Sequence, residues 1–386
     1  MGYDLAVGPL GILGGGQLGR MTLQAASTLG IDVVVAERFP DSPAARLTSQ
    51  SVVFSHGWDE SAALDRFARL APVVTLENEF VDAGVLDTLE RRGTLVLPPP
   101  ACVRVVQDKL LQKLSLAQAQ LPVPRFRGVE DPLGVGQAGA EMGWPLMLKA
   151  RRDGYDGRGN VVVRDATEAR SALSALGWPD RPVFVEAFTH FERELAVLVV
   201  RGRDGQVAQY PVVETRQDPK LHLCREVLAP AGVSSDVEQR AAAIARQAVE
   251  AVGGVGAFGV ELFLLRDGDV CINELAPRPH NSGHYTIEAA CTSQFDNHVR
   301  AVLGLPLGSP ELRTPAAAMV NLVGTQTASL ADGDLGLALA EPHTYVHLYG
   351  KSENRPGRKM GHVTALGASV DEALGRARAA AGRLRL

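Results

Sequence analysis

The sequence is poor in cysteine. Its 386 residues include four, Cys102, Cys224, Cys271 and Cys291, and no two of them form a Cys-x-x-Cys pair or stand at a zinc-ligand spacing. We therefore expect neither a disulfide framework nor a structural zinc site. Scattered single thiols in a large chain are typical of reduced core residues, which indicates a cytoplasmic protein.

The sequence also lacks an excess of basic residues and any long apolar segment. Its 39 lysines and arginines against 44 acidic residues give a formal net charge of −5, which favours neither a nucleic-acid nor a membrane partner. No run approaches the roughly 20 apolar residues of a membrane span. The opening segment MGYDLAVGPLGILGGG has no basic region of a signal peptide. Because 386 residues exceed one ordinary core, we expect two or three domains.

The first hundred residues contain apolar runs that alternate with helical segments. Runs such as GILG, VVVAE and PVVTLE predict a parallel sheet covered by helices over 1–105. The turn Gly14–Gly19 fits the Gly-x-Gly-x-x-Gly pattern and Glu37 ends the next strand, so a nicotinamide site is one interpretation. A helix N-terminus after this turn suits any other phosphate equally well. Ligands bind such sheets at the carboxyl ends of the strands, where Glu77–Glu79 also falls.

A second domain, expected over 106–185, contains a polar glycine-rich loop. The loop Arg151–Asn160 follows a short strand that carries Lys149. Glycines let backbone N–H groups approach phosphate oxygens, and a lysine beside them could neutralise those oxygens. The spacing is not that of a P-loop, and the alternative is a flexible hairpin tip. The remaining residues, 186–386, are expected to form an α+β body with a small C-terminal region.

The segment GVELFLLRDGDVCINEL predicts a hairpin that brings two carboxylates together. Asp267–Gly268 between two apolar runs is typical of a two-residue turn, and that turn places Glu261 directly opposite Glu274. Opposed like charges are destabilising, so we expect a cation such as Mg²⁺ between them. Asn273 offers a further oxygen, although it should point to the opposite face. The alternative is two exposed glutamates on an edge hairpin, and a one-residue bulge would break the alignment.

Several segments together resemble a known family. In order, KARRDGYDGRGN, VEAFTHFERELAV and NELAPRPHNSGHYTIEA resemble the ATP-grasp superfamily. With GGGQLGRM near the start and YGK and GRKMGHVT near the end, nearly the whole chain is similar to the N5-carboxyaminoimidazole ribonucleotide synthetase family. The resemblance implies an α/β and α+β, ATP-grasp fold with an N-terminal parallel α/β domain, a glycine-rich lid and a small C-terminal domain.

The resemblance also implies a reaction. Members use ATP, Mg²⁺ and bicarbonate to carboxylate 5-aminoimidazole ribonucleotide through carboxyphosphate, releasing ADP and phosphate, and a homodimer is expected. In the family the Gly14–Gly19 turn takes the ribonucleotide's phosphate, which leaves Glu37 as a strand-end surface acid. Family members commonly carry a histidine near ATP, but here the aligned positions read Arg216–Gln217, with His222 further on.

The family's site residues carry over by position. Those expected to bind ATP are Lys109, Lys149, Gly154, Tyr155, Asp156, Gly157, Arg158, Gly159, Asn160, Glu186, Ala187, Phe188, Thr189, Glu194, Asn273 and Glu274. Those expected to bind the ribonucleotide are Gln17, Leu18, Glu77, Tyr155, Arg158, Arg278, His280, Asn281, Lys351 and Arg358. Glu261 and Glu274 are the expected Mg²⁺ ligands, which agrees with the hairpin count. Expected catalytic residues are Arg278, to hold the anionic intermediate, and Asp156 or His280, which compete with released phosphate as proton acceptor.

Three other functions remain open. One is a related ligase such as a formate-dependent glycinamide ribonucleotide transformylase, another is a nicotinamide oxidoreductase built on Gly14–Gly19, and the third is a non-catalytic nucleotide sensor. Four histidines without acidic or histidine partners at ligand spacing are expected to pack in the core or face solvent: His56, His190, His343 and His347.

Overall fold

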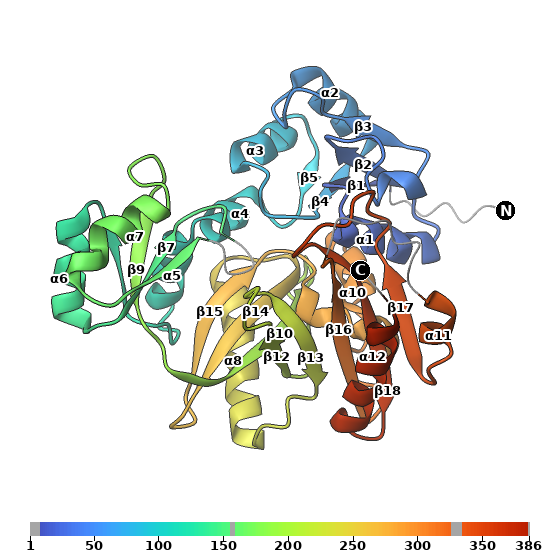
Figure 1. Cartoon of the computed structure of the whole chain (residues 1–386). Coiled ribbons are helices and arrows are strands. Elements are labelled where there is room, and N and C mark those ends of the chain that lie inside the picture. Colours follow the sequence, from blue (N-terminus) through green and yellow to red (C-terminus); the bar gives the residue numbers. More distant parts are fainter. Residues whose placement is uncertain (1–7, 155–158, 326–333, 385–386) are drawn as a thin grey trace.

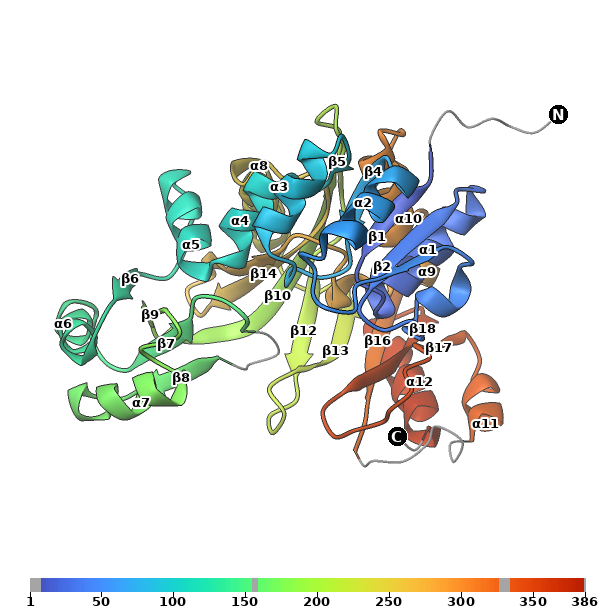
Figure 2. The same cartoon turned by 90° about the horizontal axis from the view of Figure 1, so that it is seen from above.

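The computed structural model describes residues 8–154, 159–325 and 334–384, and its strands form three sheets (Figure 1). A parallel sheet near the N-terminus and a small antiparallel sheet both adjoin a large body sheet. Figure 2 shows the small sheet on one side of the body and the C-terminal strands on the opposite side. None of the helices in these ranges combines the length and apolar character needed to cross a membrane.

The N-terminal sheet is parallel throughout, in the order β3-β2-β1-β4-β5. Its inner strands are apolar on both faces, as in Val33–Val35, because helices cover both sides. Its elements are β1 (Leu10–Leu13), α1 (Gln17–Thr28), β2 (Val33–Glu37), β3 (Ser51–Val53), α2 (Ser61–Leu70), β4 (Val73–Leu76), α3 (Ala83–Arg91), β5 (Leu95–Val96) and α4 (Pro100–Gln107). The predicted α/β character of this part is confirmed.

The small sheet forms a lobe with the antiparallel order β6-β9-β7-β8. Its elements are α5 (Lys109–Gln118), β6 (Phe126–Val129), α6 (Pro132–Met142), β7 (Leu146–Ala150), β8 (Asn160–Val163), α7 (Ala169–Ala175) and β9 (Val183–Ala187). Asp108 caps α5 by accepting from the N–H groups of Leu110 and Leu111, and it also binds Arg151 at the start of the glycine-rich loop. The lobe ends with β9, so the expected domain limit at residue 185 falls inside this strand.

The body sheet runs in the order β15-β14-β10-β12-β13-β16-β18-β17, with β11 beside β10. Its strands are β10 (Phe191–Arg201), β11 (Val207–Gln209), β12 (Val213–Gln217), β13 (Cys224–Ala229), β14 (Gly256–Leu265), β15 (Val270–Ala276), β16 (Ala316–Val323), β17 (Thr344–Leu348) and β18 (Lys359–Gly367). Its helices are α8 (Ser235–Ala251), α9 (Thr286–Ala289), α10 (Gln294–Leu303), α11 (Leu335–Leu339) and α12 (Val370–Arg383). The C-terminal strands thus extend the body's own sheet.

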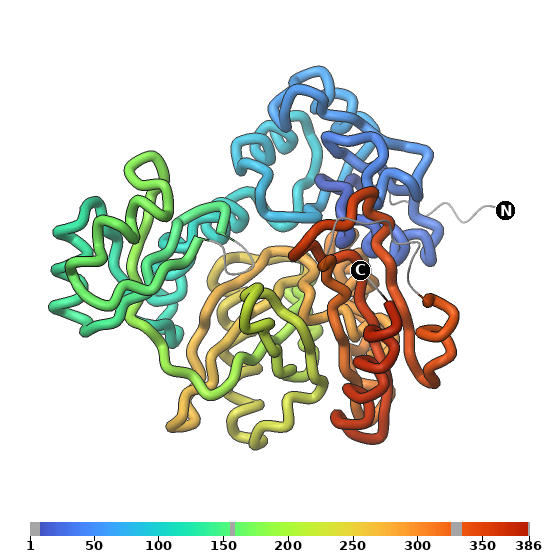
Figure 3. Tube along the Cα trace, viewed as in Figure 1, coloured from blue at the N-terminus to red at the C-terminus, as the bar shows by residue number. Residues whose placement is uncertain are grey.

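Helix α10 of the body closes the core of the N-terminal sheet. Its residues Phe295 and Val299 share a buried cluster with Leu10 and Ile12 of β1. A loop from the C-terminal part, 350–359, also reaches the N-terminal domain (Figure 3), where Arg46 donates a hydrogen bond to the carbonyl of Gly350 at 3.2 Å. All three sheets therefore meet around one region.

A buried histidine joins α10 to the N-terminal sheet and makes stability pH-dependent. His298 Nδ1 accepts from the Ala257 N–H at 3.0 Å, so its other ring nitrogen, 2.9 Å from Thr75 Oγ1, carries the proton of a neutral ring. Burial lowers the pKa of His298 to about 3, and burial also lowers the pKa values of His284 and His362. Because the unfolded chain then binds more protons, we expect stability to fall as pH drops below roughly 6.5.

This expectation is checked by thermal unfolding between pH 7.5 and pH 5. The midpoint should fall over this range, and His298→Asn should reduce the slope because it removes one of the groups that titrates only on unfolding. Exposed His222, replaced by Asn, serves as the control and should leave the slope unchanged. An identical slope in the wild type and the His298 variant would contradict the assignment.

Candidate active site

A pocket of about 1000 Å³ opens where the three sheets meet. Its walls include Gln17 and Glu77 from the parallel sheet, Lys109 from α5, and the glutamates of the β14–β15 hairpin. The loop after β15 and the 351–359 loop complete it. Gln17, Glu77 and Lys109 each lie at a strand end or a helix start, as expected for sites in sheet proteins.

The hairpin carboxylates are directly opposed, as predicted, but by a different route. Glu261 pairs with Glu274 in the β14–β15 register, and both line the pocket. The predicted two-residue turn is wrong, because the Leu265 N–H donates to the Asp269 carbonyl at 2.8 Å and three residues form the loop. A bulge on β15 next to Glu261 compensates for the added residue, so the bulge restores the alignment it was expected to break.

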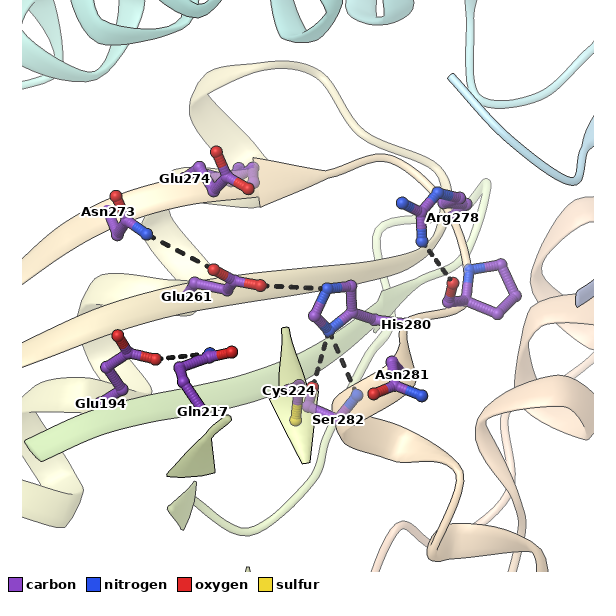
Figure 4. A network of polar contacts seen from close by, with 12 residues as sticks. Glu194, Gln217, Cys224, Glu261, Asn273, Glu274, Arg278, His280, Asn281 and Ser282 are labelled. Atoms are coloured by element: carbon purple, nitrogen blue, oxygen red, sulfur yellow. Dashed lines mark hydrogen bonds and ion pairs between the residues drawn. The ribbon is translucent and has the colours of Figure 1, made fainter. Parts of the chain in front are cut away.

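The bulge also corrects the prediction for Asn273. This residue was expected to point to the opposite face, but its Nδ2 lies 3.4 Å from Glu261 Oε2 (Figure 4). Its Oδ1 lies 3.4 Å from Lys149 Nζ. A bulge leaves one residue unpaired in the ladder and re-aims its side chain. Asn273 therefore joins the carboxylate pair on the same side of the sheet.

Each opposed glutamate has a basic neighbour. Lys109 Nζ donates to Glu274 Oε2 at 2.6 Å, and His280 Nε2 lies 3.3 Å from Glu261 Oε1. Burial acts to raise the pKa of Glu274, but the Lys109 ammonium outweighs it and lowers that pKa to about 2. Glu274 is therefore ionised at neutral pH, and the two carboxyl groups present oxygens of the kind that Mg²⁺ prefers. Within the described ranges, no group of three or more histidine, cysteine or acidic side chains is placed to hold a metal unaided.

Behind this pair lies a buried cluster of three charges. Glu186 of β9 forms ion pairs with Lys149, whose Nζ lies 2.6 Å from Oε2, and with Lys113, whose Nζ lies 2.9 Å from Oε1. The side chain of Glu186 is thus an ion-pair partner inside the protein. Lys113 was not singled out in the sequence, where it reads as one more polar position of α5. The neighbours Ala187, Phe188 and Thr189 are half-buried where β9 ends, as a segment bordering a ligand would be.

Glu194 of β10 lies next to one of the two residues that align with the family's histidine. Gln217 Nε2 donates to Glu194 Oε2 at 2.6 Å, so the residue aligned with that histidine lies beside the expected ribose-binding acid (Figure 4). Burial raises the pKa of Glu194, and the hydrogen bond from Gln217 opposes the rise.

Arg278 joins the body to the N-terminal domain. Its guanidinium binds both oxygens of Glu79, through Nε to Oε2 and through Nη2 to Oε1 at 2.9 Å. Burial acts to raise the pKa of Glu79, but the charge of Arg278 lowers it overall. Glu79 had been placed at a strand end without a role, because a sequence does not give the partner of an acid 199 positions away. Nearby, Asn281 exchanges two hydrogen bonds with Asn321 of β16.

The glycine turn carries two carboxylates. Glu37 Oε2 accepts from the Gly15 N–H at 2.6 Å, and Glu77 Oε1 accepts from the Leu18 N–H at 3.3 Å. The interpretation of Glu37 as a surface acid is therefore wrong, because it binds the turn and lines the pocket. Burial raises the pKa of Glu77. Gly14 has φ +103°, which a side chain would strain, so this turn does require glycine.

The 351–359 loop brings positive charge to the pocket. Lys351 and Arg358 both line it, and Lys351 Nζ donates to the Lys359 carbonyl at 2.6 Å while lying 5.5 Å from the Tyr349 ring centre. Tyr349 in turn binds His362 Nδ1 at 3.0 Å.

His347 of β17 has an acidic and a histidine partner that do not stand at ligand spacing in the sequence. Its Nε2 lies 2.6 Å from Glu288 Oε1, and its ring stacks on His362 with centres 4.4 Å apart. Glu288 lies on α9 and the histidines on β17 and β18, so spacing along the chain could not reveal the contact.

Part of the glycine-rich loop lies outside the described residues: Tyr155, Asp156, Gly157 and Arg158. Of the others, Gly154 lines the pocket, Gly159 has φ +89°, and Asn160 begins β8 opposite Lys149.

This combination of an N-terminal parallel domain, a lobe and a body sheet around lysines and paired carboxylates defines an ATP-grasp enzyme. Three family models match the chain: a ribonucleotide synthetase preATP-grasp domain over 8–107, an ATP-grasp domain over 114–295, and a phosphoribosylaminoimidazole carboxylase C-terminal domain over 317–376. The chain belongs to the family of N5-carboxyaminoimidazole ribonucleotide synthases, and the predicted fold is confirmed.

Relatives and solved structures are similar over nearly the whole chain. The N5-carboxyaminoimidazole ribonucleotide synthase of Synechococcus elongatus is 41% identical over 93% of this chain and 90% of that protein. The chloroplastic phosphoribosylaminoimidazole carboxylase of Vigna aconitifolia is 42% identical over 95% of this chain, which spans 65% of that longer protein. The synthase of Aspergillus clavatus in complex with ADP and 5-aminoimidazole ribonucleotide has a TM-score of 0.88 and 37% identity, covering 98% of this chain and 99% of that one.

Proposed function

We propose that this chain carboxylates 5-aminoimidazole ribonucleotide with bicarbonate and ATP, giving N5-carboxyaminoimidazole ribonucleotide, ADP and phosphate. The observation that carries the proposal is that the Glu261–Glu274 pair shares one pocket with Arg278 and the basic 351–359 loop. A phosphoryl-transfer site and a site for a second anionic substrate are thus adjoining. The Aspergillus clavatus complex named above holds ADP and the ribonucleotide, which supports this reading.

ATP would lie between the lobe and the body sheet. Lys109 and Lys149 would bind its phosphates and Glu194 its ribose, and the end of β9 would border the adenine. Glu261 and Glu274 fit Mg²⁺ because both offer carboxyl oxygens, the ligand type that this ion prefers, to one pocket. When bound, the ion would neutralise charge on the transferring phosphoryl group.

Carboxyphosphate, an acyl phosphate formed from bicarbonate, would lie near Arg278. Its negative charge suits a guanidinium held in place by Glu79. The substrate amine must lose a proton on carboxylation, and His280 lies 3.3 Å from Glu261, which could share that proton. Asp156 and released phosphate are the other acceptors we consider.

The ribonucleotide's phosphate is better placed at Lys351 and Arg358 than at the glycine turn. A phosphate at that turn would face Glu37 and Glu77, whose oxygens already accept from Gly15 and Leu18. The N–H groups of Gly15 and Leu18 are thus already donating, and carboxyl and phosphate oxygens both act as acceptors. We therefore revise the expectation drawn from the family resemblance: Gln17, Leu18 and Glu77 would meet the sugar or the base, with Asn281 nearby.

A substrate-omission assay tests the proposal. ADP release should require both bicarbonate and 5-aminoimidazole ribonucleotide, and omitting either should lower the rate at least roughly 100-fold, the scale of losing a positioned reactant. Formate with glycinamide ribonucleotide is the matched alternative pair. ADP release with that pair instead would establish the transformylase reaction, and NADH binding without competition by ADP would favour an oxidoreductase.

We also propose that the protein is cytoplasmic, because its cysteines are scattered single thiols. We propose a homodimer because the family resemblance implies one. Light scattering on the purified chain tests the assembly.

A further inference from the structure

Two buried ammonium groups behind the nucleotide site share one carboxylate. Within the described part of the chain, the ion pairs of Lys113 and Lys149 both go to the carboxylate of Glu186. The Lys113 and Glu186 side chains are only 2% and 3% exposed. Either lysine can therefore leave Glu186 while the other keeps its carboxylate paired, whereas losing both would leave a buried charge without a partner.

The two lysines face different ways. Lys149 Nζ lies 3.4 Å from Asn273 Oδ1, beside the opposed glutamates that line the pocket. Lys113 Nζ instead donates to the carbonyl of Ile272 in β15 at 3.0 Å, so it ties α5 to both the lobe and the body. Burial lowers the pKa of Lys113, whereas the two ammonium groups hold the pKa of Glu186 below its ordinary value against the effect of burial. Lys149, the lysine beside the pocket, is therefore the one that can exchange Glu186 for a bound anion.

We propose that Lys113 is a positioning residue for nucleotide binding, because it keeps Glu186 paired while Lys149 turns to the ATP phosphates. Without Lys113, Lys149 could leave Glu186 only by stranding a buried carboxylate, and removing one partner of a buried ion pair is strongly unfavourable. Lys149 would then remain paired with Glu186 and would not bind the nucleotide. This inference rests on the proposed assignment of Lys149 to ATP.

The test measures the affinity for magnesium ADP by calorimetry, without bicarbonate or ribonucleotide. Lys113→Met should weaken binding roughly 10- to 100-fold, the scale reported for partners that orient binding-site ligands. Lys113→Gln keeps hydrogen-bond donors and loses only the charge, so it should fold readily and weaken binding to a similar extent. The double variant Lys113→Met with Glu186→Gln should recover most of the affinity, because no carboxylate then restrains Lys149.

Exposed Lys220, replaced by Met, is the matched control. A merely structural Lys113 would lower the unfolding temperature and leave the affinity of Lys113→Gln at the wild-type value, which would overturn the proposal. Equal weakening in the single and double Met variants would also overturn it. If the wild type itself fails to bind magnesium ADP, the nucleotide assignment of the proposed function falls together with this role. Wild-type binding with an unaffected Gln variant refutes the role of Lys113 alone.

Discussion

Replacing Glu274 with Gln should lower bicarbonate- and ribonucleotide-dependent ADP formation by roughly 1000-fold, a loss typical of removing a principal electrostatic group. Glu274 opposes Glu261 and holds Lys109 at 2.6 Å. The substitution removes a proposed Mg²⁺ ligand, and Lys109 also loses its ionic partner. Because Gln has nearly the same size and shape, the unfolding temperature should change little. A coupled assay for ADP and a thermal scan measure the two effects.

The matched control is Glu250→Gln on the exposed face of α8, which should keep wild-type turnover. Calorimetry provides a second readout, because magnesium-dependent ADP binding should weaken in the Glu274 variant and not in the control. Wild-type turnover by the Glu274 variant would refute the metal assignment. If the Glu274→Gln variant does not fold, the calorimetry is repeated with Glu274→Asp. This variant keeps the charge and should restore part of the binding.

Replacing Lys351 with Ala should raise the KM for the ribonucleotide by roughly 30- to 1000-fold, the range for losing one partner of a desolvated charge pair. Lys351 lines the pocket, and its ammonium donates to the Lys359 carbonyl and lies near the Tyr349 ring. The KM for ATP should stay within about twofold, since the nucleotide is proposed to lie on the other side of the opposed glutamates. Steady-state kinetics with each substrate varied in turn makes the measurement.

Lys220→Ala, a surface change, should leave both constants unchanged. An equal rise in both KM values for Lys351→Ala would contradict a role specific to the ribonucleotide's phosphate.

The sequence predicts those parts of this molecule whose determinants are local. Strand and helix alternation in the first hundred residues and the apolar runs around Glu261 and Glu274 gave the sheets and the carboxylate pair. The predicted opposition of Glu261 and Glu274 is correct, although the turn is one residue longer than predicted and a bulge at Asn273 offsets that extra residue. Neither the longer turn nor the bulge changes the apolar pattern, so the sequence did not reveal them.

The determinants that the sequence did not reveal are contacts between distant elements. Glu79 is paired with Arg278, and His347 with Glu288, across separations that no periodicity encodes. Lys113 is buried because β9 and β15 supply its partners, whereas its position on α5 alone resembles a surface site. Such residues become recognisable only when the sheets are assembled.

A ligand bound in this pocket would contact all three parts of the chain that form its walls. A ligand that contacts the glycine turn, the hairpin and the 351–359 loop together adds its binding free energy to the interfaces that hold those parts in place. Saturation should therefore merge their melting into one cooperative transition. The same linkage means that each part expressed alone would lose most of the affinity, since no single sheet retains a complete wall.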